Sequence, residues 1–107
     1  MTRNLELMDQ LDFEGWNGRD WDLFSQLHGE EVIVAGFGTM TEGNAEHVAW
    51  AQAFIEENPT SMIEAHPIRI GAGDWTAVVG TFVGGGSMCT VARWEDGRIA
   101  EEYLFSG

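Results

Sequence analysis

The sequence predicts an α+β protein in which helices come first and an antiparallel meander of strands follows. Apolar residues in the first third of the chain recur at helical spacing. After Pro59 the pattern changes to four β-rich segments, which are separated by glycine-containing turn signals. A length of 107 residues suits one domain, so we expect residues 1–107 to fold around a single core.

The first helix is expected over residues 2–17, where apolar side chains form a stripe that Leu11 or Asp12 continues. Gly18 can adopt the left-handed conformation that closes helices, and it therefore marks the end of this one. A second, short helix is expected over residues 21–28, with Asp20 as its N-cap.

The middle of the chain predicts two short strands and a longer helix. An apolar, β-branched run over residues 32–35 favours a strand, and a second strand is expected over residues 39–41. Asn44 is expected to cap a third helix that ends near Asn58, because Pro59 cannot easily continue it. Several side chains of this helix share one face: His47, Trp50, Ala51, Phe54 and Ile55.

The last half of the chain predicts four strands, over residues 62–72, 75–83, 87–94 and 99–105. Glycine-containing segments typical of hairpin turns separate them: Gly73-Asp74, Gly84-Gly85-Gly86 and Asp96-Gly97.

Charge and composition narrow the choice of partners. Eighteen acidic and five basic residues give a net charge of −13, which argues against binding to nucleic acids or anionic membranes. The single cysteine, Cys89, excludes an internal disulfide and an all-cysteine zinc site. The N-terminus lacks the apolar stretch of a signal peptide, and no apolar run is long enough to span a bilayer. We therefore expect a cytoplasmic protein.

Four local motifs occur in a characteristic order: residues 16–22 (WNGRDWD), His66-Pro67, residues 73–77 (GDWTA) and residues 92–105 (ARWEDGRIAEEYLF). In this order and spacing they resemble the nuclear transport factor 2-like superfamily, a cystatin-like α+β fold. Within it, the chain resembles the SnoaL-like group of polyketide cyclases, which lies close to the ketosteroid isomerases. The resemblance extends over nearly the whole sequence.

The resemblance implies a cone-shaped, curved antiparallel sheet wrapped around the long helix, with two N-terminal helices and a ligand cavity at the open end. It also implies a homodimer that packs through the outer sheet face. Active members carry out acid–base chemistry on apolar carbonyl compounds without a cofactor, so no cofactor is expected here. In the SnoaL cyclases the base is an aspartate on the final strand, and Leu104 takes its place in this sequence. The cyclase reaction itself is therefore not implied.

Two side chains are hypothesised to carry a proton. In a regular strand, His66 would share one face with Ile68 and Ile70. It is then either a base in an apolar pocket or a histidine at the edge of the core. Glu102 falls on the face where the family's aspartate lies, although a register error of one residue would exchange it with Glu101.

Tyr103 has two interpretations. If its face of the strand points inward, its hydroxyl could donate a hydrogen bond to a developing oxyanion. If its face points outward, on the side expected for Ile99 and Glu101, Tyr103 packs at the dimer interface.

Aromatic residues and methionines are abundant for so short a chain, and they fill the core or line an apolar cavity. The residues expected around the cavity are Trp16, Phe37, Met40, His47, Trp50, Phe82, Met88 and Leu104. Metal binding is not expected, because His28, His47 and His66 fall on three different elements without a local ligand spacing. His28 has a structural explanation, since a cation is favourable near a helix C-terminus.

Three functions agree with these features. The first is a cofactor-independent isomerase, cyclase or lyase that acts on an apolar carbonyl compound, with His66 or Glu102 as proton carrier and Tyr103 as hydrogen-bond donor. The second is a non-catalytic protein that binds an apolar small molecule, which the leucine at position 104 favours. The third is a structural or regulatory dimer whose own side chains fill the cavity.

Overall fold

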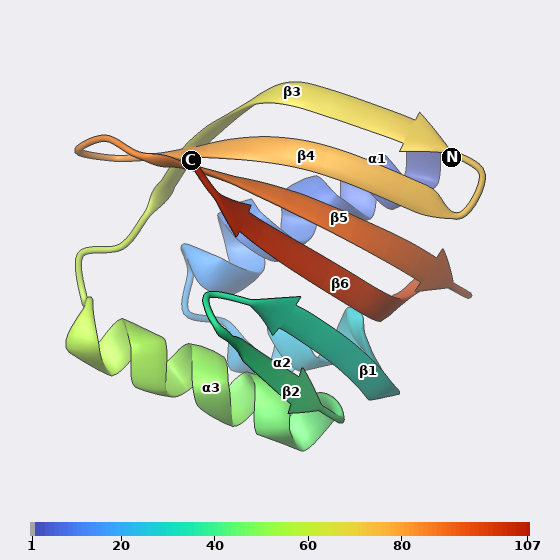
Figure 1. The fold of residues 1–107 in the computed structure, drawn as a ribbon, viewed down its shortest axis with the longest axis horizontal. Helices are drawn as coiled ribbons and strands as arrows, with labels where there is room; N and C mark the ends of the chain where they lie inside the picture. Colours follow the sequence, from blue (N-terminus) through green and yellow to red (C-terminus); the bar gives the residue numbers. More distant parts are fainter. Residues whose placement is uncertain (1) are drawn as a thin grey trace.

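The computed structural model describes residues 2–107 and confirms the α+β prediction (Figure 1). Its elements follow one another as α1 (Thr2–Gln10), the π-helix η1 (Leu11–Trp16), α2 (Trp21–Gln26), β1 (His28–Gly36), β2 (Thr39–Glu42), α3 (Asn44–Glu57), β3 (Ile63–Ala72), β4 (Trp75–Phe82), β5 (Ser87–Glu95) and β6 (Arg98–Ser106). The predicted strands of the second half agree with β3 to β6 to within one residue at each end, because the glycine turns fix their limits.

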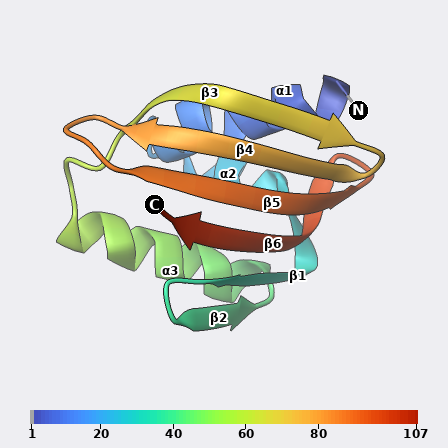
Figure 2. The same ribbon diagram turned by 45° about the horizontal axis from the view of Figure 1, so that its top comes forward.

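The strands form one curved sheet in the order β2-β1-β6-β5-β4-β3. Strands β3 to β6 make the expected antiparallel meander, whereas β1 pairs with β6 in parallel. The helices lie on the concave side of this sheet (Figure 2). Helix α1 packs against β3 and β4, and α3 packs against β1 and β2. The sheet and the helices thus enclose the core.

The core lies between the N-terminal helices and the concave sheet face. Met8 of α1, Leu11 of η1 and Ile99 of β6 belong to one core cluster, and each is at most 2% exposed. Trp94 is also buried, and its indole nitrogen donates a hydrogen bond of 2.9 Å to the hydroxyl of Thr76. This bond satisfies the polar end of a side chain that otherwise contributes only apolar surface to the core.

The predicted ends of the first helices need correction. The left-handed residue is Arg19, with φ of 53°, and not Gly18. Gly18 is required for a different reason, since a Cβ there would lie 2.3 Å from the carbonyl oxygen of Glu14. The second helix ends at Gln26 instead of His28, because His28 already belongs to β1.

The sequence analysis predicted Asn44 as the N-cap of the third helix, and this is wrong. Asn44 is the first residue of α3, and Gly43 is the N-cap. Its side-chain amide donates hydrogen bonds to the carbonyl oxygens of Ser25 and His28, at 2.9 and 2.8 Å. Asn44 therefore holds the start of α3 against the junction of α2 and β1.

Strand β3 contains two irregularities that change the faces of its side chains. Its register against β4 shifts between Ile63 and Ala65 and again between Ala65 and Ile68. Ile68 and Ile70 are consequently 52% and 59% exposed on the outer face, whereas the His66 side chain is 2% exposed on the inner one. The expectation that these three share a face is wrong, because an extra residue in a strand reverses the alternation that follows it.

Strand β6 has one such shift, near its start, where Trp94 pairs with Ile99 and Arg93 pairs with Glu101. The sequence analysis placed Ile99 and Glu101 on one face, and this is wrong. Ile99 is fully buried on the inner face, whereas Glu101 lies on the outer one. Beyond this point the alternation is regular, so that Glu102 and Leu104 are buried on the inner face.

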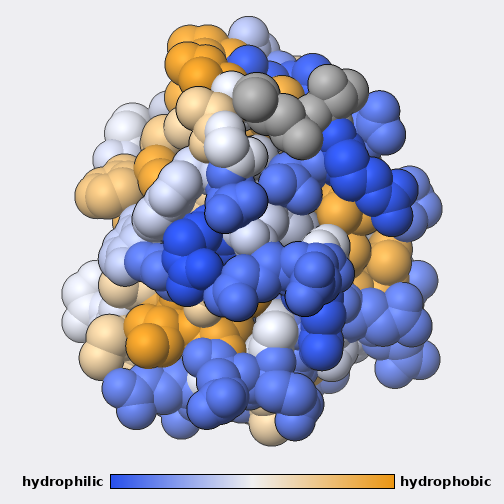
Figure 3. All heavy atoms as spheres, turned by 90° about the vertical axis from the view of Figure 1, so that its right-hand side faces the viewer, coloured by the Kyte–Doolittle hydropathy of each residue, from blue (hydrophilic) through white to orange (hydrophobic). Residues whose placement is uncertain are grey.

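Hydrophilic residues cover most of one end of the molecule, where the β3–β4 hairpin and the β5–β6 turn lie (Figure 3). This agrees with the large excess of acidic residues in the sequence. None of the helices in residues 2–107 combines the length and the apolar character that crossing a membrane requires.

Candidate functional site

A small apolar cavity of about 50 Å³ opens between the concave face of the sheet and the helices. Its lining consists of Leu11, Asp12, Trp16, Phe24, Phe37, His47, Trp50, Phe54, Phe82, Met88, Thr90, Glu102 and Leu104. The residues that the sequence predicted around a cavity are therefore present, with one exception. Met40 lies on the edge strand β2 and is 54% exposed, because Thr41 is the residue of this strand that faces inward.

Phe37 lines the cavity and is also half exposed, so it marks the mouth of the cavity, where it pairs with Trp50. The ring of Phe37 stacks on that of Trp50, with centroids 6.2 Å apart and an angle of 10° between the planes. Phe37 belongs to the tight turn between β1 and β2, in which Phe37 and Gly38 have φ of 52° and 74°. A bulky residue in this conformation is an outlier, so the turn holds the aromatic ring at the mouth at a cost in backbone strain.

Asp12 brings a carboxylate to the apolar wall. It lies in η1, whose wide turns are closed by bonds such as that from the Asn17 amide to the Asp12 carbonyl oxygen, at 3.0 Å. Asp12 and its neighbour Leu11 are both buried. Insertions of this π-helical kind often occur at functional sites.

His66 connects Asp12 to a second carboxylate. Its Nε2 lies 2.7 Å from Oδ2 of Asp12, and its Nδ1 lies 2.8 Å from Oδ1 of Asp9. Asp9 in turn accepts two hydrogen bonds from the guanidinium group of Arg69, at 2.7 and 3.1 Å. His66 itself does not line the cavity, but it reaches the cavity through Asp12.

The surroundings shift the proton affinity of both members of this pair. Burial raises the pKa of Asp12 and outweighs the lowering caused by the hydrogen bond from His66. Burial alone would lower the pKa of His66, but its hydrogen bonds to Asp12 and Asp9 reverse this and raise it. Because both of its ring nitrogens face carboxylates, His66 donates to each of them as an imidazolium.

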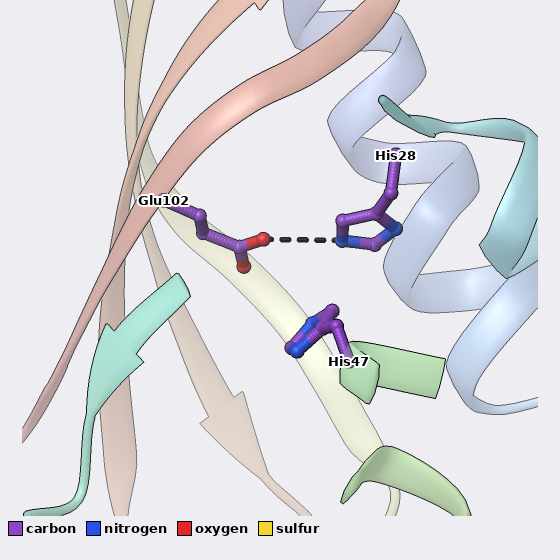
Figure 4. A group of neighbouring side chains, drawn as sticks. All are labelled: His28, His47 and Glu102. Atoms are coloured by element: carbon purple, nitrogen blue, oxygen red, sulfur yellow. Dashed lines mark hydrogen bonds and ion pairs between the residues drawn. The ribbon is translucent and has the colours of Figure 1, made fainter. Parts of the chain in front are cut away.

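Glu102 is the second carboxylate of the cavity, and it lies on the inner face, as the sequence analysis hypothesised, whereas Glu101 lies on the outer face. Its Oε1 lies 3.1 Å from Nε2 of His28 (Figure 4). Burial raises the pKa of Glu102, yet the hydrogen bond and the charge of His28 outweigh this and lower it. Asp12 and Glu102 therefore have pKa values shifted in opposite directions within one cavity.

Tyr103 lies outside the cavity, and a role as oxyanion donor there is wrong. The regular alternation of β6 turns it to the outer face, where its hydroxyl donates a hydrogen bond of 2.7 Å to Glu101. Glu101 also accepts a bond of 2.6 Å from Arg93. This group belongs to a hollow on the outer side of β1, β5 and β6.

Trp16 supplies a donor that the sequence analysis did not assign. Within residues 2–107, its indole nitrogen is the one buried side-chain polar atom without a hydrogen-bond partner. Trp16 lines the cavity, so an oxygen atom of a bound molecule could accept this bond. Leu104 also lines the cavity, at the position where the resemblance places the base of the cyclases.

Two of the residues that the sequence analysis did not assign to the site are Asp12 and His28. Asp12 had a signal in the sequence, since it is an acidic residue at a position that continues the apolar stripe of the first helix. His28 had none, because it was interpreted as a helix-terminal residue, and its contact with Glu102 joins positions 74 apart.

Comparison with known proteins agrees with the fold. The profile of the SnoaL-like domain matches residues 12–102. A candidate isomerase of the SnoaL-like family from Agrobacterium tumefaciens superposes with a TM-score of 0.84 at 20% identity, covering 100% of this chain and 99% of that one. A candidate polyketide cyclase from Sinorhizobium meliloti superposes with a TM-score of 0.82 at 17% identity, covering 94% of both chains.

A candidate ketosteroid isomerase from Kribbella flavida also superposes, with a TM-score of 0.79 at 20% identity, covering 99% of this chain and 78% of that one. The curated proteins contain no match to the sequence. At identities of 17–20% these structures show a shared fold, and they do not show that this chain shares their activities.

Proposed function

The chain belongs to the SnoaL-like domain family, and we propose that it moves a proton on a compact apolar carbonyl compound by acid–base catalysis in the cavity. The observation that carries the proposal is the placement of Asp12, a buried carboxylate with a raised pKa that lines an apolar cavity and is bonded to His66. A carboxylate tuned in this way is a stronger base than a solvated one.

In the proposed reaction, the carboxylate of Asp12 removes a proton from the carbon next to the carbonyl group, which yields an enolate and a protonated Asp12. The same proton then returns to a different carbon, which completes an isomerisation. Alternatively, a leaving group on the neighbouring carbon takes the proton from Asp12 as it departs, which completes an elimination. The indole N–H of Trp16 donates a hydrogen bond to the enolate oxygen. His66 is a positioning residue, because it acts on the reaction only through Asp12.

Glu102 is the alternative base, but its environment favours it less. Its lowered pKa makes it a weaker base than Asp12, and its Oε1 is already engaged by His28. The proposed roles therefore differ from the hypothesis drawn from the sequence, in which His66 or Glu102 carried the proton itself.

The size of the cavity restricts the ligand. At about 50 Å³ it is smaller than the engineered cavity of roughly 150 Å³ that holds benzene. A carbonyl compound of one ring therefore needs the mouth to widen, and Phe37 is placed to do this, since its side chain is 48% exposed and stacks on Trp50 at the entrance.

Deuterium exchange tests the proposal without knowledge of the natural substrate. The protein is incubated in D₂O with small cyclic ketones and enones, and deuterium uptake next to the carbonyl group is followed by NMR. We expect catalysed exchange that falls about 10²- to 10⁴-fold in Asp12→Asn. Glu101→Gln is the matched control, because Glu101 lies on the outer face, and it should exchange like the native protein. Equal exchange in Asp12→Asn and the native protein would refute the role of Asp12.

A second candidate function is non-catalytic binding of an apolar molecule. It is favoured by Leu104, which places an alkyl side chain where the cyclases of the family have their base. Isothermal titration with the same ketones separates the two functions. Binding without deuterium exchange supports the binding protein, whereas binding with exchange supports the enzyme.

We also propose that the chain forms a homodimer through the outer sheet face. A row of paired residues crosses four strands on this face: Ile68, Val79, Cys89 and Phe105. The two residues at the ends of the row, Ile68 and Phe105, are 52% and 58% exposed. Apolar surface of this kind is typical of a protein interface. Ile68→Glu should convert the dimer to a monomer in light-scattering measurements, whereas a monomeric native protein would contradict the proposal.

A further inference from the structure

Three potential metal ligands meet beside the cavity, and two of them line it. They are His28 at the start of β1, His47 in the first turn of α3, and Glu102 in β6. One ligand atom from each lies within 4.8 Å of the other two, and all three residues are at most 5% exposed. Figure 4 shows both imidazole rings and the carboxylate pointing toward one shared space.

We propose that His28, His47 and Glu102 bind one divalent transition-metal ion, such as Zn²⁺, through two imidazole nitrogens and a carboxylate. Two histidines and one carboxylate are a ligand set that such ions favour, and three protein ligands leave a coordination position open. The proposal is independent of the acid–base function, since it involves neither Asp12 nor His66.

The orientation of His28 suits a metal ligand. Its Nδ1 lies 2.7 Å from the carbonyl oxygen of Phe24, and because a carbonyl oxygen can only accept, Nδ1 carries a proton. The other nitrogen, Nε2, faces Oε1 of Glu102 at 3.1 Å and donates a hydrogen bond to that oxygen in the metal-free protein. Two electron-rich atoms this close need a cation between them, which is either a proton or a metal ion. Metal-binding histidines commonly donate their second N–H to a backbone carbonyl in the same way.

His47 is held in a similar manner. Its Nδ1 lies 3.2 Å from the hydroxyl of Thr41, so Nε2 is left for another partner. The ring stacks on Phe24 and on Trp50, with centroid distances of 5.4 and 5.6 Å, which fixes its plane. Burial lowers the pKa of His47 to about 4, so at pH 7 the ring is neutral and can act as a ligand.

The distances are close to those that coordination requires. Bonds of about 2.0–2.1 Å in a tetrahedral site place ligand atoms about 3.3 Å apart. The pair from His28 and Glu102 already has a separation of 3.1 Å, and the ligand atom of His47 lies within 4.8 Å of both. Since His47 and Glu102 line the cavity, an ion held by them would be in reach of a molecule bound there. A carbonyl oxygen of that molecule could occupy the open coordination position.

Titration with Co²⁺ tests the site, because its visible absorption reports the number and kind of its ligands. The protein is prepared without a polyhistidine tag and treated with a chelator first. We expect one equivalent of Co²⁺ to bind with intense absorption typical of four or five ligands, and Zn²⁺ to displace it. Glu102→Gln and His47→Gln should each weaken binding at least tenfold. His66→Gln is the control and should bind Co²⁺ like the native protein.

The native protein alone supplies a second test, in case a variant does not fold. Saturating Zn²⁺ should raise its melting temperature, since an ion that binds only the folded state stabilises it. The proposal is overturned if the native protein binds no equivalent of Co²⁺, or if binding is unchanged in Glu102→Gln and His47→Gln. It is equally overturned if His66→Gln abolishes binding, because the ion would then lie between His66 and its two aspartates.

Discussion

Nε2 of His66 lies 2.7 Å from Oδ2 of Asp12, although the two residues are 54 positions apart in the sequence. The contact joins strand β3 to the π-helix η1 and places a buried carboxylate on the wall of the cavity. A buried acid with a histidine behind it, facing apolar side chains, is suited to moving protons. The acid–base proposal depends on this contact.

The first prediction concerns the pH dependence of stability. The pKa of His66 is raised in the folded state above its ordinary value of 6.5. The ion pairs of His66 therefore stabilise the folded state fully below pH 6.5. This stabilisation is lost as the pH rises through the folded-state pKa. His66→Gln removes this contribution. The difference in unfolding free energy between the native protein and the variant should therefore be larger at about pH 6 than at about pH 9. Urea unfolding at the two pH values measures it, and a difference that grows with pH would contradict the assignment.

The second prediction concerns the buried pair of Glu102 and His28. Glu102→Ala leaves a buried imidazole without its carboxylate, and this should destabilise the metal-free protein by about 3–5 kcal/mol. Glu101→Ala is the matched control on the neighbouring residue. Its ion pair with Arg93 lies at the surface and is screened by solvent, so its loss should cost much less than the loss of Glu102. Urea unfolding in the presence of a chelator compares the two, and equal losses would contradict the burial of Glu102.

The third prediction concerns the mouth of the cavity. Phe37→Asn removes the ring that stacks on Trp50 and places a residue favoured at positive φ in the turn. An apolar fluorescent dye should therefore enter the cavity faster in this variant, as stopped-flow fluorescence can measure. Phe105→Asn is the control, since Phe105 is exposed on the outer face. An equal rate in the variant and the native protein would show that Phe37 does not limit entry.

The fourth prediction concerns the core. Trp94→Phe removes the hydrogen bond to Thr76, leaves that buried hydroxyl without a partner and opens a void. We expect a loss of about 2–4 kcal/mol in unfolding free energy. Trp75→Phe should cost less than about 1 kcal/mol, because Trp75 is 39% exposed. Denaturation followed by circular dichroism measures both variants, and similar losses would contradict the packing described for Trp94.

The meander of the second half could be predicted from the sequence because its signals are local. The turns at Gly73, Gly84 to Gly86 and Gly97 all have positive φ, a conformation that glycine adopts readily, and they set the ends of the strands. The parallel pairing of β1 with β6 could not be predicted in this way, since it joins segments from opposite ends of the chain and leaves no local pattern.

The candidate site was only partly predictable. The inward orientation of Glu102 follows from simple alternation beyond the irregularity in β6. The burial of His66 depends on two irregularities in β3 that the sequence does not announce, and the same strand turns Ile68 outward. The partners of these residues, Asp12 and His28, come from other elements, so only the folded structure could identify them.

The most direct test of the central claim is the titration of the Asp12 carboxyl group by ¹³C NMR in the ligand-free protein. We expect a pKa above the ordinary value of 3.8, because burial outweighs the hydrogen bond from His66. In His66→Gln the pKa of Asp12 should rise further, since the imidazolium that lowers it is gone. A pKa at or below 3.8 in the native protein would show that Asp12 is a stabilised carboxylate and contradict its role as the base.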